Sequence, residues 1–293
     1  MILIDPAVWP AHGTVFSHLV SDTSLAELHD FAQAAGLPER AFDHDHYDVP
    51  LSRHDDLVAR GAVAVPASEL IRRLIASGLR MRTAERTPKR VVALQRLGES
   101  WSALLPGHEA IGSELVERWT ESHRHYHDVR HLHQVLQALD QLGADPDDRL
   151  LRLAAWFHDA VYQGTPDDEE HSAQLAERML ARVLPPAQVD EVARLVRLTR
   201  THDPHPDDRP GAHLVDADLS ILGVRPGRYD VYVRDVRADY AHVDDARWRV
   251  GRVQVLDHLL GLEPLFRTEV GREMWAGRAA ENLHADRERW LAH

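Results

Sequence analysis

Four ionisable side chains stand where the surrounding pattern predicts the apolar face of a helix. His158 and Asp159 lie in the segment LLRLAAWFHDAVY, Asp218 lies in AHLVDADLSILG, and His131 borders an apolar helical stripe in VRHLHQVLQAL. A buried carboxylate without a partner costs several kcal/mol, so we expect a cation or a strong partner beside each of them. Imidazole and carboxylate groups together are ligands for a divalent metal ion.

Two of these positions allow a second interpretation. Adjacent helical residues point about 100° apart, so His158 and Asp159 can approach one ion from two sides. Alternatively, Asp159 bonds the other nitrogen of an imidazole in a satisfied core pair.

Asp216 precedes Asp218 by two residues, so it faces nearly the opposite way on a helix. We expect Asp218 to point inward and Asp216 to cap the helix or lie at its rim.

Two further histidines could join the site. His127 and His131 are four residues apart and share one helix face, although this spacing alone is weak evidence for a metal site. His202 continues the apolar stripe of a predicted helix at the point where that helix ends. For His202 we favour an interaction with the helix dipole over a place in the site.

The elements that must position these residues fall into two regions. Short apolar runs at 2–5 and 62–65 predict strands, and helical patterns occupy 23–36 and 68–78, which predicts a small α/β domain over 1–80. The polar stretch 81–90 reads as a linker. The remainder, 91–293, predicts an all-α domain with helices at 91–105, 109–121, 128–142, 148–162, 168–183, 187–201, 213–222, 228–241, 246–260 and 271–290.

Composition excludes several classes of function. The 293 residues contain no cysteine, which rules out disulfides, thiolate nucleophiles and cysteine-ligated zinc or iron–sulfur centres. The formal charge of −13 argues against long nucleic acid as a partner. No apolar run approaches the ~20 residues of a membrane span, and MILIDPAVWP lacks the charged start of a secretory signal. We therefore expect a cytoplasmic protein without a membrane partner, and we allow for a homo-oligomer.

The order His131, His158-Asp159, Asp218 resembles the HD superfamily of metal-dependent phosphohydrolases, and residues 91–293 are similar to a bacterial group predicted to have that activity. The resemblance rests on the strings RHYHDVRHL, WFHDAVYQ, DDEEHSA, DADLSILG and AENLHADRE, and on the Tyr240 segment with Gly251-Arg252. It implies an all-α HD-type domain in which His131, His158, Asp159 and Asp218 bind a divalent metal and His127 donates a proton. The proton-donor role of His127 comes from the resemblance of YHDVRH to the cyclic-nucleotide phosphodiesterase branch, and Asp128 departs from the Asn of that branch. Asp168 departs from the Asn that is usual in the bacterial group.

Three other residues enter as substrate-binding or supporting candidates: Glu169, His202 and Arg252. Glu169 matches the resembling group, but it also follows a good helix N-cap at Thr165–Asp168. Arg252 could clamp a phosphate through its guanidinium, and it could equally be an arginine on a helix surface.

These residues imply hydrolysis of a phosphate ester in a small molecule, a nucleotide being the favoured class, by metal-activated water. Mixed nitrogen and oxygen ligands suit Mn²⁺, Fe²⁺, Zn²⁺ or, less well, Mg²⁺. A non-catalytic nucleotide sensor is the alternative. A di-iron oxygenase is a weaker one, because it needs more ligands, for which His171 and His202 are the spare candidates.

The first region resembles a family of uncharacterised bacterial domains that are sometimes fused to this HD group. The strings that carry this resemblance are WPAHGTVFSHLVSDTSLAELH, DHYDVP and SGLR. Its polar residues could form a second site, and the members of that set are Asp5, His12, His18, Asp43, His44, Asp45, His46 and Asp48. We favour the simpler interpretation that DHDHYDVP is a solvated loop leading into Pro50.

Overall fold

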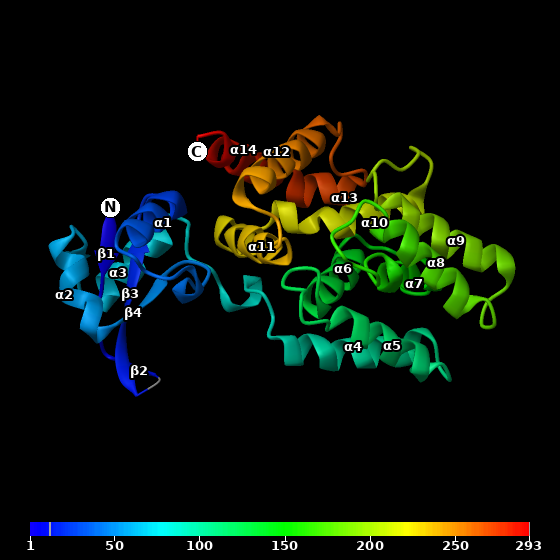
Figure 1. Cartoon of the computed structure of the whole chain (residues 1–293), viewed down its shortest axis with the longest axis horizontal. Coiled ribbons are helices and arrows are strands. Elements are labelled where there is room, and N and C mark those ends of the chain that lie inside the picture. Colours follow the sequence, from blue (N-terminus) through cyan, green and yellow to red (C-terminus); the bar gives the residue numbers. More distant parts are fainter. Residues whose placement is uncertain (12, 293) are drawn as a thin grey trace. The chain divides into compact units, whose positions relative to one another are not determined.

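The computed structural model describes residues 1–11 and 13–292 and contains two compact units. One comprises Met1–Arg86 with Arg225–Val231, and the other comprises Thr87–Val224 with Tyr232–His293. The predicted architecture is confirmed: an α/β region comes first and an all-helical region follows (Figure 1). Among the described residues, no helix is both long enough and apolar enough to cross a bilayer.

The first unit is built on a small mixed sheet with strand order β2-β3-β1-β5, and β4 pairs with β3. Its strands are β1 Ile2–Ile4, β2 Trp9–Ala11, β3 Thr14–Ser21, β4 Tyr47–Pro50 and β5 Val63–Ala64. Strand β1 runs parallel to β5 and antiparallel to β3. The predicted strands at 2–5 and 62–65 are thus present, whereas β2, β3 and β4 were not predicted.

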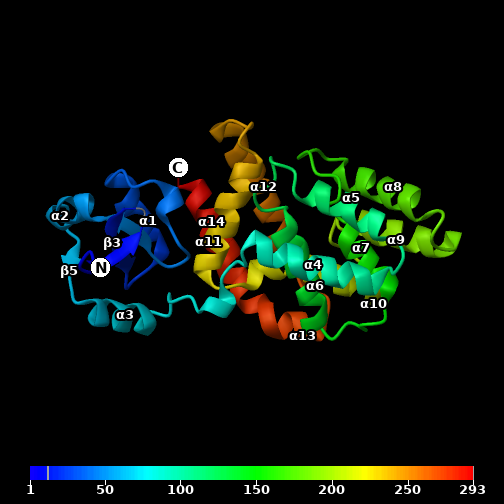
Figure 2. The ribbon, with the colours of Figure 1, turned by 90° about the horizontal axis from the view of Figure 1, so that it is seen from below.

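Alternation along the central strands divides the apolar side chains of this sheet between its two faces. Ile2 and Ile4 pack with α1 (Leu25–Ala34) and α2 (Leu51–Ala59). Leu3 packs with α3 (Ala67–Ala76), which covers the other face (Figure 2). Both faces are therefore partly covered, which accounts for the continuous apolar run of β1.

The prediction of a solvated loop at DHDHYDVP is wrong. Asp45 and His46 are buried, and Tyr47–Pro50 forms strand β4 against β3. A buried carboxylate needs donors, and Asp45 has three: the backbone N–H of Met81, the guanidinium of Arg80 and the imidazole of His46. His12 lies outside the described residues.

The second unit consists of helices joined by turns and longer loops. They are α4 Arg90–Leu104, α5 Glu109–Trp119, α6 Val129–Gln141, α7 Arg149–Phe157, α8 Asp168–Leu180, α9 Pro186–Leu198, α10 Arg209–Asp218, α11 Pro226–Asp239, α12 Asp245–Gly261, α13 Glu269–Gly271 and α14 Gly277–Leu291. Helix α11 begins in the segment that belongs to the first unit. Most bounds agree with the helical periodicity of the sequence to within a few residues.

Two predicted helices differ in ways that affect the site. The helix predicted over 148–162 ends at Phe157, because the carbonyls of Asp159 and Ala160 accept hydrogen bonds from the Arg124 guanidinium and do not continue the helix ladder. The helix predicted over 213–222 begins earlier, at Arg209, where the Asp208 side chain caps it. It ends at Asp218 and is followed by a 3₁₀ turn, Leu219–Gly223.

The core beneath the site is aromatic. Trp119 and Trp156 are both fully buried, and the indole N–H of Trp119 donates to the carbonyl of Trp156 at 3.0 Å. The Trp119 ring packs against the imidazoles of His131 and His158, with centroids 6.2 and 5.4 Å away. This large apolar contact fixes the orientation of both histidines.

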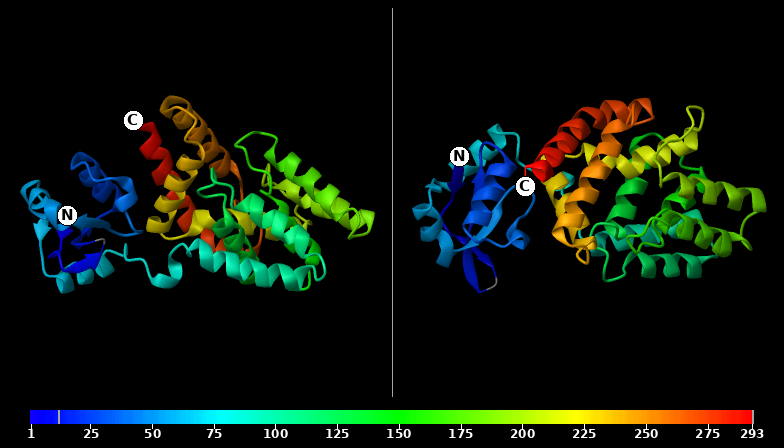
Figure 3. Two further views of the ribbon diagram at one scale, coloured as in Figure 1. Left: turned by 60° about the horizontal axis from the view of Figure 1, so that its bottom comes forward. Right: turned by 45° about the horizontal axis from the view of Figure 1, so that its top comes forward.

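Arg252 is a core residue and not the surface arginine of the alternative interpretation. It lies on α12, which packs beside α14 (Figure 3), and its guanidinium contacts Asp286 at 2.7 and 3.1 Å. Arg252 is 4% and Asp286 2% exposed, and the Arg252 guanidinium also lies 5.3 Å from the ring centroid of Tyr232. Because this guanidinium already pairs with the Asp286 carboxylate and contacts the Tyr232 ring, the suggested role of Arg252 as a phosphate clamp is not supported.

We predict that Asp286→Asn lowers the free energy of unfolding by about 3–5 kcal/mol, because it leaves the Arg252 charge buried without its counter-ion. The exposed pair Arg287–Asp257 joins the same two helices, and Asp257→Asn should cost at most about 1 kcal/mol. Urea unfolding of both variants measures the difference. Equal losses would contradict the assignment of Arg252 to the core.

Candidate metal centre in the helical unit

Four side chains from two helices and the turn after a third meet in the second unit. His131 lies on α6, His158 and Asp159 follow α7 directly, and Asp218 is the last residue of α10. The Nε2 atoms of His131 and His158 are 3.0 Å apart. The carboxylate of Asp218 lies 3.2 Å from the first of these nitrogens and 3.7 Å from the second.

Asp159 completes the cluster. Its carboxylate is 3.4 Å from Nε2 of His158 and 3.8 Å from Nε2 of His131, so these three residues offer ligand atoms close enough to hold one ion. The imidazoles are buried, while the side chains of Asp159 and Asp218 keep 14% and 15% exposure. The cluster is therefore closed on the histidine side and reachable by solvent on the carboxylate side.

A hydrogen bond identifies the nitrogen that His158 presents. Nδ1 of His158 contacts the carbonyl of Ala155 at 2.7 Å and must donate to it, so its Nε2 carries a lone pair toward the cluster. Asp159 approaches this Nε2 and not Nδ1, which contradicts the alternative of a satisfied core pair through the other nitrogen. Among the described residues, Nδ1 of His131 is buried without a hydrogen-bond partner.

The donor set fits a divalent ion. Two ligands about 2.1 Å from one ion and at right angles to each other lie about 3 Å apart, and the spacing widens as that angle opens. The contacts of 3.0 to 3.8 Å fall in this range. Two neutral imidazoles and two carboxylates bring a charge of −2, which favours a cation.

Asp218 is held as a carboxylate. Its burial raises the pKa, but hydrogen bonds with His131 and His202 and the nearby imidazole of His158 outweigh that effect and lower the pKa well below the usual range. Burial lowers the pKa of His131, which favours the neutral imidazole that metal binding requires.

The structure corrects the expectation for Asp216. This residue is fully buried and lies neither at a cap nor at the rim. Its carboxylate accepts hydrogen bonds from the backbone N–H groups of Arg267 and Thr268 and from the Thr268 hydroxyl. Asp216 therefore anchors the chain before α13, and only Asp218 of the pair faces the cluster.

His202 also differs from the favoured expectation. It follows the end of α9 in a left-handed conformation, with φ of 52°, and its Nε2 lies 2.9 Å from the Asp218 carboxylate. A non-glycine residue adopts this conformation at a cost of about 1–2 kcal/mol. The imidazole therefore contacts the cluster and does not act on the helix dipole.

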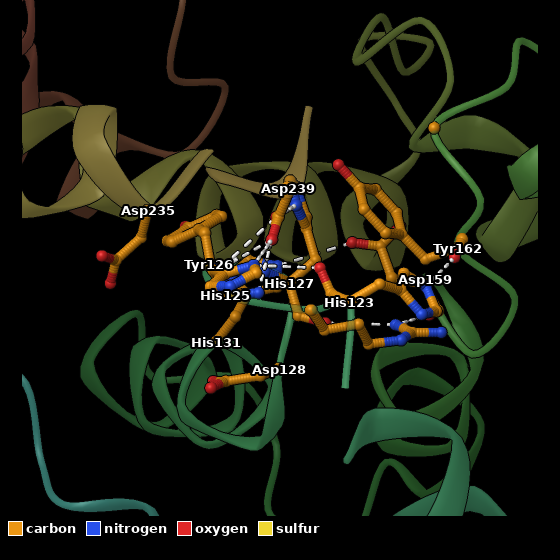
Figure 4. A network of polar contacts seen from close by, with 12 residues as sticks. His123, His125, Tyr126, His127, Asp128, His131, Asp159, Tyr162, Asp235 and Asp239 are labelled. Carbon is orange, nitrogen blue, oxygen red and sulfur yellow. Dashed lines mark hydrogen bonds and ion pairs between the residues drawn. The ribbon is translucent and has the colours of Figure 1, made fainter. Parts of the chain in front are cut away.

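His127 lies beside the cluster and is oriented by Asp239, the last residue of α11. Nδ1 of His127 is 2.8 Å from the Asp239 carboxylate, which also accepts the backbone N–H groups of residues 125–127 (Figure 4). The His127 ring stacks on Tyr162 at a centroid distance of 4.2 Å. Its centroid is 5.6 Å from that of His131.

The environment of His127 favours its protonated form. Burial would lower the pKa of His127, but the hydrogen bond with Asp239 and the charges of Asp159, Asp239 and Asp218 outweigh burial and raise it. Because Nδ1 faces Asp239, Nε2 is the atom from which a proton can leave. Sequence reasoning missed Asp239, whose only signal was its place before Tyr240 in a resembling segment.

Arg124 is the second residue that sequence reasoning missed. Its side chain is fully buried, and its guanidinium donates to the carbonyls of His127, Asp159 and Ala160 at 3.1, 2.7 and 3.2 Å. One arginine thus fixes the backbone on both sides of the cluster.

Glu169, Asp168 and His171 lie in the first turn of α8. Burial raises the pKa of Glu169, and the charges of Asp159 and Asp168 add to the increase. Asp168 is buried and accepts the backbone N–H groups of residues 163–165, so it holds the turn that follows Asp159. His171 is exposed, which removes it as a spare metal ligand.

Comparison with known proteins covers only the first unit. Residues 2–77 match the family described as "Protein of unknown function (DUF4031)", which is less than half of the chain. No family match supports the HD resemblance of the helical region. No curated protein and no solved structure matches the chain.

Proposed function

We propose that the helical unit is an HD-type phosphohydrolase that cleaves a phosphate ester of a small molecule, with nucleotides as the favoured class. The observation that supports this most is the pair of imidazole Nε2 atoms of His131 and His158, 3.0 Å apart, with the carboxylates of Asp159 and Asp218 each 3.2 to 3.8 Å from both nitrogens. The order of these residues along the chain is that of the HD superfamily.

These four residues would hold a divalent ion such as Mn²⁺, Fe²⁺ or Zn²⁺, with Mg²⁺ less suited to the nitrogen ligands. A divalent ion bound there supplies hydroxide at neutral pH and positive charge for a phosphoryl oxygen. Asp159 and Asp218 are the partly exposed members, so substrate would enter from their side.

The other residues act on protons and orientation. His127 donates a proton from Nε2 to the leaving alkoxide. Asp239 raises the pKa of His127 and fixes the orientation of its ring through Nδ1. His202 orients the Asp218 carboxylate through its 2.9 Å contact. Glu169, with its raised pKa, is available as a further proton donor near Asp159.

The test is a panel of phosphate mono- and diesters assayed with chelator-treated full-length protein. We expect no phosphate release until Mn²⁺ is added, and release from at least one nucleotide after that. Failure of every substrate with every candidate metal would contradict the proposal. Tight nucleotide binding without turnover would favour a sensor, and oxygen uptake by the iron-loaded protein would favour a di-iron oxygenase.

A further inference from the structure

A second His/Asp cluster lies in the first unit, on the sheet. Strands β3 and β4 are antiparallel and place His18 directly opposite Asp48. His46 precedes Asp48 by two residues, so both point to the same side of the chain. His18, His46 and Asp48 each offer one ligand atom, and these atoms lie within 4.8 Å of one another.

Each histidine of this cluster is held by a buried carboxylate through Nδ1. Nδ1 of His18 is 2.9 Å from Asp5, which also accepts the backbone N–H of His18. Nδ1 of His46 is 2.6 Å from Asp45. Asp5 and Asp45 are 1% and 0% exposed. Buried carboxylates that fix Nδ1 in this way leave Nε2 as the available ligand atom, which is the usual arrangement behind metal-bound histidines.

The cluster is open on one side. The rings of His18 and His46 are 4.9 Å apart, and Nε2 of His46 lies 3.5 Å from the Asp48 carboxylate. The Asp48 side chain is half exposed and that of His18 is partly exposed. An ion could therefore enter from solvent without rearrangement of the sheet.

We propose that the first unit binds a divalent transition-metal ion of the Zn²⁺ type through Nε2 of His18, Nε2 of His46 and the carboxylate of Asp48. Two imidazoles and one carboxylate are a known zinc ligand set, and three protein ligands leave a coordination position open to water or substrate. Asp5 and Asp45 orient the two histidines. This site is independent of the one in the helical unit.

The competing occupant is a proton on His46. Burial lowers the pKa of His46, but its hydrogen bonds with Asp45 and Asp48 outweigh burial and raise it to about 9. In that case His46 bridges the two carboxylates as an imidazolium and no ion enters. Metal uptake is therefore measured at a pH of about 9, where the proton no longer dominates on His46.

The experiment uses the full chain carrying His131→Ala and Asp159→Ala, which removes the helical site, so that failure of the proposed hydrolase does not affect the result. After chelation, the protein is reloaded with Zn²⁺ or Co²⁺, and bound metal is counted by mass spectrometry. We expect one ion per chain, and with Co²⁺ we expect visible absorption bands. His18→Gln with His46→Gln should remove this ion.

Two further variants keep the result decisive. Asp48→Asn alters a half-exposed side chain, so it should leave the circular dichroism spectrum unchanged while weakening binding at least about tenfold. His54→Gln is the matched control, because His54 lies on α2 of the same unit and pairs with exposed Asp55. The His54→Gln variant should keep the ion. The proposal is overturned if the starting chain binds no ion, or if all three variants bind equally.

Discussion

Replacing Asp159 with alanine is expected to reduce metal-dependent phosphate release by a factor of about 10⁴ or more, the scale seen when one member of a catalytic unit is removed. Asp159 contributes one of two carboxylates to the cluster, and its loss halves the negative charge that attracts the cation. The expected result is loss of both activity and the metal ion of the helical unit, measured by phosphate assay and metal analysis.

The fold should survive this change. The backbone carbonyl of Asp159, and not its side chain, accepts the hydrogen bond from Arg124, so the turn after α7 keeps its anchor. Asp207→Ala serves as the control, because Asp207 is an almost fully exposed carboxylate. Phosphate release that persists in Asp159→Ala would remove the metal mechanism.

His127→Asn is expected to lower kcat by about 10² to 10⁴, the usual contribution of a general acid. Its metal content should stay unchanged, because His127 lies beside the cluster and not in it. The loss should be much smaller for a p-nitrophenyl ester than for an alkyl ester, since a stable leaving group needs no proton. Equal losses on both esters would mean that His127 only supports the structure.

The variant Asp239→Asn tests the role of His127 as general acid through the pH dependence of kcat. The hydrogen bond with Asp239 raises the pKa of His127. Because the reaction needs protonated His127, the activity of the unaltered protein falls as pH rises through that pKa. Without the carboxylate, the pKa of His127 falls and the alkaline limb of the kcat profile moves to lower pH. His205→Asn, which changes a highly exposed histidine, should leave the profile in place.

The helical region follows closely from local pattern. Its apolar residues recur at helical spacing, and Pro or Gly marks most of the breaks. The sheet was harder to predict because β3 carries Ser17 and Ser21 in buried positions and β4 is only four residues long. Both strands are defined by pairing between distant segments, which a local pattern does not contain.

The site could be predicted only where local pattern reveals it. Four residues stood out because each is polar in an apolar segment: His131, His158, Asp159 and Asp218. Asp239 did not stand out, since its partner His127 lies 112 residues away. The end of α7 at Phe157 was misplaced because Arg124, distant in the sequence, bonds the carbonyls that follow it, and a local pattern does not contain that contact.

The position of Arg124 has a consequence for experiments that combine substitutions. A single guanidinium bonds the peptide carbonyls of both His127 and Asp159, so a shift at one residue is transmitted to the other. Free-energy changes from paired substitutions around this arginine should therefore not be additive. Double-mutant cycles across these positions would measure how strongly the turn that carries Asp159 is coupled to His127.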